Sequence, residues 1–458
     1  MKKIALSMLV VVSILSAAQK IDHTLSQDHT YEKTLQPTSY HIEGWNFFGD
    51  IRAGWVQYDY DNPPQGLDSD NNAIAKNPNI NKGHVDSKGF YIIPKVSVRS
   101  PYYHNFMFQV TGVAVTDFDI NDEKYEQRNF VFDPTKKKPY ALLQEAFIYY
   151  GLKDNRMLVG REELTTPMID ADDWYMLADS FELARYSNKQ LENITFNLGY
   201  FLKMAGVWDS GTDGTKFHSM SDASFINEAD KQRIGDKGIY FGSFLYNDEK
   251  HHNFQLWEYY GQDMYNTLFL QYDYTNSIDK FNYDIGFQII NFDDVGKLED
   301  SQSQTNIYYT LYSARFDGDF SNGINFATGI SKYSDGDGQG ATLGAFGGYP
   351  YFANGMIFHF FEAESLRNAA SYKGQIGYSF DKIGINNMWL GYRLTYFDLD
   401  SSYSKDADGN KQNTMLLNGI RLSYGSKSGA YFTGTYEHVN LDEEPNTFSL
   451  RLIGGYKF

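Results

Sequence analysis

The stretch TFSLRLIGGYKF, residues 447–458, alternates between two kinds of side chain. Phe448, Leu450, Leu452, Tyr456 and Phe458 share one parity, whereas the other parity carries mostly Thr, Ser, Arg and Lys side chains. Strict alternation sends the two sets to opposite faces of a β-strand. The stretch therefore predicts a strand with one apolar face and one largely polar face.

The same period of two recurs along most of the chain. Phe281, Tyr283 and Ile285, for example, alternate with Asn282 and Asp284. Such segments predict 18 strands, at residues 46–60, 89–100, 105–119, 140–151, 156–164, 181–188, 193–204, 238–247, 253–262, 265–275, 281–292, 304–317, 323–334, 366–380, 386–398, 414–425, 429–441 and 447–458. Sixteen strands remain an alternative, because the pattern is weak at 156–164, 181–188, 253–262 and 304–317.

The composition excludes several classes of protein. The chain has 458 residues, a formal net charge of −18 and a mean hydropathy of −0.50. Its polar average excludes a bundle of membrane helices, and its acidic balance argues against a nucleic-acid partner, which requires a basic footprint. The absence of Cys excludes disulfides, Cys-ligated metals and a thiol nucleophile. Aromatic residues make up 17% of the chain, which is too many for a disordered acidic protein.

Two architectures fit strands of this kind, a soluble sandwich and a transmembrane barrel. A transmembrane antiparallel β-barrel puts the apolar face on lipid and the polar face on a lumen. Closure satisfies every backbone polar group in lipid, which an open sheet cannot do. The barrel is favoured because aromatics gather at the segment ends, because short turns alternate with long loops, and because the chain stops on Phe458 inside a strand. We therefore predict a barrel of about 18 strands with short periplasmic turns and long extracellular loops, in which Tyr456 and Phe458 form the assembly signal.

The first residues predict export. Lys2 and Lys3 precede an apolar run, and small residues at 16–18 resemble a cleavage site, which is the order of a secretory signal. A membrane anchor is the alternative, but the run is short for a span, which needs about 20 residues. We expect a signal peptide at 1–18, a polar periplasmic segment at 19–44 and the barrel at 45–458, in a bacterial outer membrane.

Several short motifs resemble a known family. They are GREELTTP at 160–167, an acidic run that follows it, KMAGVWD at 203–209 and GDIRAG at 49–54. Their order resembles the OprD-type outer-membrane porins, particularly those of epsilonproteobacteria, specifically between about 140 and 210 and more diffusely elsewhere. The family pattern would carry Gln where Glu162 stands.

The resemblance implies an 18-stranded barrel with one pore per chain, narrowed by loops that fold inward. It also implies uptake of small solutes, commonly carboxylates or amino acids, past a row of basic side chains. Expected partners are outer-membrane lipid and lipopolysaccharide, the outer-membrane assembly machinery and small hydrophilic solutes, with the chain a monomer or a loose trimer.

The predicted inner face can also be read directly from the residues. Charges facing lipid are costly, so charged strand residues should face the lumen. The basic candidates are Arg52, Lys95, Arg99, Arg161, Arg185, Lys203, Lys373, Arg393, Arg421 and Arg451. The acidic candidates on the wall or on a constriction loop are Asp117, Glu145, Glu163, Asp170, Asp172 and Asp173. Guanidinium groups along a wall favour carboxylate solutes. Structural salt bridges across the wall, and a solvated loop surface for the Asp cluster, are the alternative readings.

Motifs for other chemistry are weak. Residues 406–410 have calcium-loop spacing but lack the required Gly and Glu. Ser321 precedes Asn322 and Gly323, but Asp319 stands where an activating His would be needed. We expect no catalytic residues, no metal and no cofactor. The sequence therefore predicts an outer-membrane porin for passive, moderately selective diffusion, and the alternative is a structural or adhesive barrel whose loops carry the function.

Overall fold

The computed structural model describes residues 44–60, 87–121, 138–171, 173, 176–206, 215–224, 226–300, 308–336, 346–348, 350–357, 366–404, 411–441 and 447–458. The expected signal peptide, nearly all of the expected segment 19–44 and Asp172 lie outside these residues. The strands are β1 (Asn46–Tyr60), β2 (Ser87–Arg99), β3 (Phe106–Val115), β4 (Tyr140–Leu152), β5 (Asn155–Glu162), β6 (Ser180–Asn188), β7 (Ile194–Ala205), β8 (His218–Ser219), β9 (Ile239–Asn247), β10 (His252–Gly261), β11 (Tyr265–Ile278), β12 (Phe281–Asp294), β13 (Tyr308–Phe320), β14 (Ile324–Tyr333), β15 (Ala370–Ser379), β16 (Met388–Asp398), β17 (Thr414–Gly425), β18 (Ala430–Leu441) and β19 (Thr447–Lys457).

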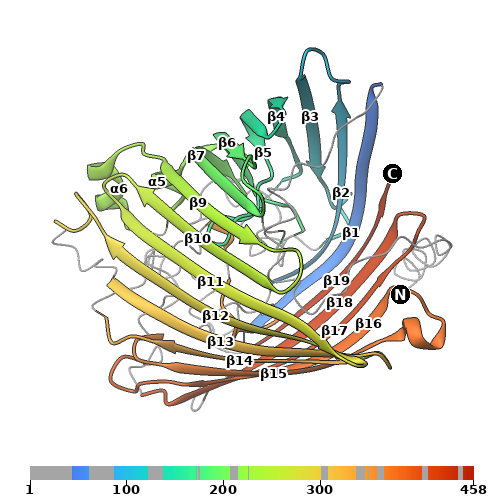
Figure 1. The fold of residues 1–458 in the computed structure, drawn as a ribbon, viewed down its shortest axis with the longest axis vertical. Coiled ribbons are helices and arrows are strands. Elements are labelled where there is room, and N and C mark those ends of the chain that lie inside the picture. Colours follow the sequence, from blue (N-terminus) through green and yellow to red (C-terminus); the bar gives the residue numbers. More distant parts are fainter. Residues whose placement is uncertain are drawn as a thin grey trace.

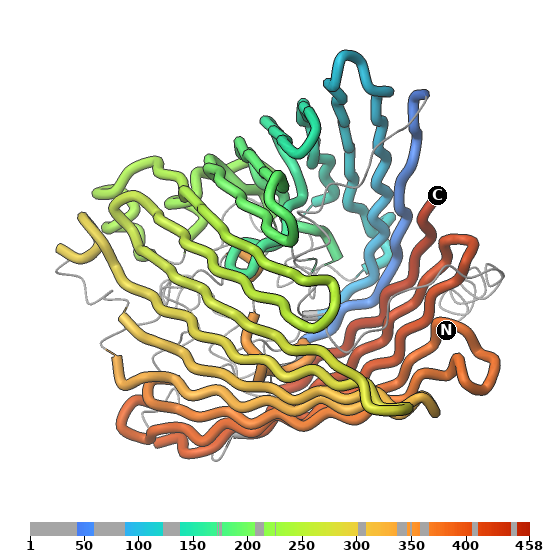
Figure 2. The backbone as a smooth tube through the Cα atoms, viewed as in Figure 1, coloured from blue at the N-terminus to red at the C-terminus, as the bar shows by residue number. Residues whose placement is uncertain are grey.

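The strands form one closed antiparallel barrel. Each barrel strand pairs with its neighbours in chain order, and β1 closes the ring by pairing with both β2 and β19 (Figure 1). The two-residue β8 only extends the edge of β7, which pairs directly with β9. The barrel therefore has 18 strands, which confirms the predicted fold and the higher of the two strand counts. Figure 2 shows the backbone winding around this single ring from β1 to β19.

The outer face of the barrel is apolar. Ile148, Val159 and Leu198 are 59–62% exposed although they lie in the middle of paired strands. The intervening inner positions include buried polar residues such as Gln109 and Gln271. An apolar exterior around a hydrogen-bonded, edge-free sheet is the arrangement that a lipid bilayer requires.

The two ends of the barrel differ in their connections. At one end, here called the short-turn end, β4–β5 and β11–β12 are joined by two residues each, and Lys153 and Asp279 adopt the positive φ of tight hairpin turns. At the opposite, long-loop end, the connections include 163–179, 206–238 and 334–369. Short helices α5 (Met220–Ala223) and α6 (Glu228–Ile234) lie in one of these loops, and η4 (Phe380–Ile383) lies in a turn. No helix in the described part of the chain is long and apolar enough to cross a membrane.

The last residue takes part in closing the barrel. The backbone N–H of Gly49 donates to the carbonyl of Phe458 at 2.9 Å, and the N–H of Phe458 donates to the carbonyl of Gly49 at 3.0 Å. Phe458 is also 52% exposed at the short-turn end.

We predict that deletion of Phe458 lowers the yield of assembled barrel, because it removes two hydrogen bonds from the closing seam together with an exposed aromatic end. The amount of heat-modifiable, membrane-inserted protein measures this yield. Lys457→Gln, which keeps the chain length, serves as the control. Equal yields of the deletion variant and the wild type would contradict this role.

Candidate functional site: a lumen narrowed by two loops

The first structure inside the barrel is the β5–β6 loop, residues 163–179. Its first half crosses toward β10, where the backbone N–H of Met168 donates to the Tyr259 hydroxyl at 3.4 Å. Leu164, Met168 and Ile169 are completely buried, in one cluster with the wall residues Tyr259 and Trp257. The inner wall of this sector is apolar because it packs against a loop rather than facing water.

The second half of the β5–β6 loop returns to the opposite wall. Met176 and Leu177 are buried against Val56 of β1 and Tyr91 of β2. Polar contacts also hold this half: the Gln144 side chain on β4 donates to the carbonyl of Ala178 at 2.8 Å. The loop therefore spans the lumen and is attached on both sides.

The second inward structure is the β14–β15 loop, described at 346–348 and 350–357. Wall side chains of successive strands donate to its carbonyls: Gln288 to Pro350, Ser371 to Ala353, Thr395 to Asn354, Arg393 to Gly355 and Arg421 to Met356, over 2.6–3.1 Å. The loop thus follows the inner wall from β12 to β17.

Glu437 on β18 completes this attachment. Its two carboxylate oxygens accept the backbone N–H groups of Met356 and Ile357, each at 2.6 Å, and its side chain is fully buried. Hydrogen bonds to a buried charged group are among the stronger ones in proteins. Glu437 is therefore a principal anchor of the β14–β15 loop.

The two loops meet inside the lumen. Ile169 and Gly347 form an antiparallel β-bridge, and the backbone N–H of Asp170 donates to the carbonyl of Phe346 at 2.8 Å. Burial raises the pKa of the Asp170 carboxyl to about 7, with a further contribution from the charge of Asp173. The folded state therefore binds this proton more tightly than the unfolded chain does, and the contribution of Asp170 to folding stability should fall as the pH rises toward 7.

We predict that Gly348→Ala increases the single-channel conductance, because the added Cβ would overlap the backbone of Met168 and push the two loops apart. Planar-bilayer recordings measure the change. Gly374→Ala is the matched control, since a Cβ at that position meets nothing within 4 Å. An unchanged conductance in Gly348→Ala would mean that the loop contact does not limit the pore.

Most of the predicted basic residues lie on the inner face, and many contact the loops. They are Arg52, Lys95, Arg99, Arg185, Lys373, Arg393, Arg421 and Arg451. Lys95 pairs with Glu163 of the β5–β6 loop. Arg99 donates to Gln109 at 2.7 Å, and Lys373 is buried on β15. The Lys95 contact gives this inner cation a structural role in holding the β5–β6 loop.

Arg185 illustrates a departure from the family pattern noted above. Its guanidinium makes a two-pronged ion pair with Glu162, at 2.8 and 2.7 Å. Both side chains are 12% exposed. A Gln at position 162 would leave the charge of Arg185 without this carboxylate, so the Glu makes the local wall less basic.

Two predicted basic residues lie in outward-facing rows instead. Arg161 pairs with Glu182, which alternates along β6 with the buried Phe181 and Leu183. Lys203 reaches the same row because a β-bulge shifts the register between β6 and β7. The sequence pattern placed Arg161 on the wrong face. In this sector the inner face is also apolar, so the row of apolar residues cannot be taken as the face that contacts lipid.

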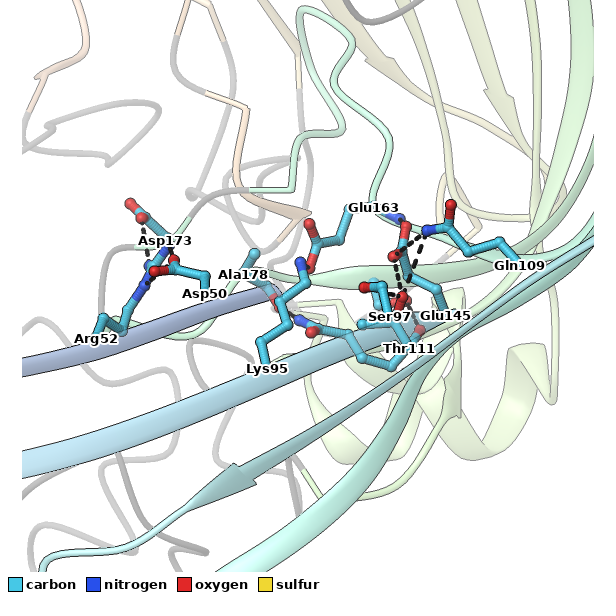
Figure 3. A network of polar contacts seen from close by, with 12 residues as sticks. Asp50, Arg52, Lys95, Ser97, Gln109, Thr111, Glu145, Glu163, Asp173 and Ala178 are labelled. Carbon is cyan, nitrogen blue, oxygen red and sulfur yellow. Dashed lines mark hydrogen bonds and ion pairs between the residues drawn. The ribbon is translucent and has the colours of Figure 1, made fainter. Parts of the chain in front are cut away.

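The predicted acids serve different purposes. Asp117 accepts backbone N–H groups of its own loop, from Asp119 and Asn121. Glu145 is buried and accepts from Gln109 and Thr111, at 2.8 and 2.6 Å. Glu163 and Asp173 lie on the β5–β6 loop beside the wall residues Lys95 and Arg52 (Figure 3), and Asp170 lies on the same loop.

Burial raises the pKa of the Glu163 carboxyl, and the nearby Lys95 opposes that shift. Glu163 therefore keeps its proton more readily than an exposed glutamate would, despite the adjacent ammonium group.

Sequence reasoning missed the buried cation Arg315 on the barrel strand β13. Its guanidinium contacts Asp273 at 2.9 Å, Asp284 at 2.7 Å and Asp317 at 3.1 Å. Its side chain is 4% exposed and lies under the ring of Phe352 from the β14–β15 loop. Ser313, Arg315 and Asp317 alternate with Tyr312, Ala314 and Phe316, which indicates a polar inner face, but the period-two pattern of the whole strand was weak.

The described wall is unevenly charged around the ring. The sector from β15 through β19 to β2 carries Lys373, Arg393, Arg421, Arg451, Arg52, Lys95 and Arg99 on its inner face, together with the carboxylates of Asp50 and Glu437. A separate sector, β11–β13, carries Asp273, Asp284 and Asp317 around Arg315, and only β14 lies between it and β15. Charges of opposite sign therefore gather in different sectors of the described wall.

Comparisons with known proteins place the fold. The chain resembles the crystal structure of Pseudomonas aeruginosa OccK9 (OpdG), with a TM-score of 0.73 and 12% sequence identity. It also resembles a BenF-like porin from Pseudomonas fluorescens Pf-5, with a TM-score of 0.72 and 14% identity. A third similar structure is that of Pseudomonas aeruginosa OpdK in complex with vanillate, with a TM-score of 0.70 and 11% identity. Each match covers 91% of this chain and 99% of the other. No protein-family model and no curated sequence matches. The fold is that of the outer-membrane OprD-type porins of Pseudomonas, and the epsilonproteobacterial assignment has no support among these structures.

Proposed function

We propose that this barrel is a porin of the bacterial outer membrane that allows passive, moderately selective diffusion of small hydrophilic solutes. The observation that carries the proposal is the attachment of two inward-folded loops to the wall, the β14–β15 loop by polar side chains of β12, β15, β16 and β17 and the β5–β6 loop by Gln144 and by apolar packing. A barrel that serves only as a surface anchor does not need a polar lumen with shaped loops. The short-turn end then faces the periplasm and the long-loop end faces outward.

We further propose that the solutes are anionic, with carboxylates or amino acids favoured. The sector from β15 to β2 supports this, because its inner cations exceed its wall carboxylates. Arg393 and Arg421 donate to carbonyl oxygens of the β14–β15 loop, which do not cancel a positive charge. A guanidinium group lowers the barrier for a carboxylate and contacts it with two parallel hydrogen bonds. The aspartates around Arg315 offer carboxylates to an amino group in a separate sector of the wall.

Liposome swelling tests the proposed function. Vesicles that contain the purified barrel should swell in a small sugar and faster in a carboxylate of similar size, whereas empty vesicles should not. A structural or adhesive barrel would give no swelling in either solute. Equal swelling rates for the sugar and the carboxylate would support diffusion and contradict the anion preference.

A further inference from the structure

We propose that Asp173 of the β5–β6 loop is a tethered carboxylate that occupies Arg52 in the lumen and exchanges with the carboxylate of a passing solute. The inference rests on the proposed function and names the residue that tunes it. Asp173 would then set how tightly the pore binds anions.

The contact has the geometry of a bound carboxylate. Nη1 of Arg52 donates to Oδ2 of Asp173 at 2.7 Å (Figure 3), and Nη2 of Arg451 donates to the backbone carbonyl of Asp173 at 3.0 Å. Arg52 and Arg451 come from the adjacent strands β1 and β19. Two guanidinium groups therefore converge on this single loop residue.

Accessibility separates this ion pair from the others in the lumen. The side chain of Asp173 is 51% exposed inside the barrel, whereas both members of the Arg185–Glu162 pair are 12% exposed and Arg315 is 4% exposed. An ion pair open to water contributes little net stability, so water or a solute can displace it. The buried pairs cannot exchange in this way.

The other carboxylate on Arg52 is fixed in place. Asp50 contacts Arg52 at 3.0 Å and also accepts the hydroxyl of Tyr431 on both oxygens, at 3.0 and 2.9 Å. Asp50 is buried on the wall, so it stays while Asp173 moves. The exchangeable position on the guanidinium is therefore the one that Asp173 fills.

The loop can keep its place while the side chain moves. Arg52 also donates to the carbonyl of Met176 at 2.9 Å, and Arg451 holds the backbone of Asp173 rather than its carboxylate. Met176 and Leu177 remain buried against β1 and β2. Release of the Asp173 carboxylate therefore does not require the loop to leave the wall.

Asp173 is ionised over the ordinary pH range. Partial loss of hydration inside the barrel opposes its charge, but Arg52 and Arg451 outweigh this effect and hold the pKa of this carboxyl below its usual value. Exchange with an anionic solute keeps the number of ion pairs on Arg52 constant. A solute is then attracted without being trapped, which conduction through a selective pore requires.

Asp173→Asn tests the proposal, with acetate as the probe. We expect the apparent affinity of the pore for acetate, from the concentration dependence of single-channel current, to rise about two- to fivefold, as loss of an exposed ion pair would allow. The reversal potential in a salt gradient should move toward the anion value. Asp222→Asn is the matched control, because Asp222 is a loop aspartate that pairs with His218 at 2.7 Å.

Several outcomes would overturn the proposal. They are an unchanged acetate affinity, an equal rise in permeation of a neutral sugar, and a rise that persists when Arg52→Gln is combined with Asp173→Asn. Failure of Asp173→Asn to assemble as a heat-modifiable barrel would also overturn it, since Asp173 would then be a structural tether. Absence of conductance in the wild type would instead refute the proposed function itself.

Discussion

Replacement of Arg315 by methionine is expected to destabilise the barrel by about 3–5 kcal/mol at pH 8, because removal of one member of a buried ion pair leaves uncompensated charge. Here three carboxylates, those of Asp273, Asp284 and Asp317, lose their shared partner. The temperature at which the barrel loses its folded electrophoretic mobility measures the effect.

The pH dependence of this variant provides a second check. Without Arg315 the three carboxylates repel one another, so the folded state should bind protons more tightly than the unfolded chain. Stability of the variant should then be recovered as the pH falls, and lost as it rises. Arg315→Lys keeps the charge and should be less damaging. A variant Arg315→Met that is as stable as the wild type at pH 8 would show that the cluster contributes nothing to folding.

Replacement of Glu437 by glutamine should release the β14–β15 loop from the wall. The carboxylate accepts two backbone N–H groups, and a glutamine amide can accept at only one oxygen and places a donor against the other N–H. Loss of hydrogen bonds to a buried charged group costs about 1.5–3 kcal/mol each. We therefore expect a larger single-channel conductance and frequent switching between conductance levels.

Glu258→Gln is the control for this prediction, because Glu258 lies exposed on the outer face of β10. The two substitutions change the same chemical group by the same amount, on opposite faces of the barrel. Quiet channels of wild-type conductance in Glu437→Gln would contradict the anchoring role.

The strands could be predicted from sequence because each carries its information locally. Alternation in 447–458 or 281–292 needs only the contrast between lipid and lumen, and the 18 strands follow from it. The rule gave the wrong face for Arg161, because the lumen beside β5 and β6 is filled by Leu164 and Met168 of a loop. Period-two reasoning assumes a polar lumen, and it fails where a loop fills the lumen with apolar side chains.

The partners of the inner cations were beyond sequence reasoning. Arg393 and Arg421 were expected on the inner wall, but nothing in the pattern indicates that the backbone of residues 354–356 lies over them. Likewise, Glu437 acts on a segment 80 residues earlier in the chain. Every residue has a backbone carbonyl, so residue identities do not show where carbonyl acceptors lie in space. The arginines in the sequence therefore do not show whether they face solutes or hold a loop.

The most direct test of the account is the single-channel current of the purified wild-type barrel in a planar bilayer with a potassium chloride gradient. A pore narrowed by the β5–β6 and β14–β15 loops should give discrete current steps. Its reversal potential should have the sign of the chloride equilibrium potential, which indicates that chloride passes more readily than potassium. A correctly folded barrel that inserts without carrying current, in the wild type and equally in Glu437→Gln, would contradict the existence of an open pathway between the two loops.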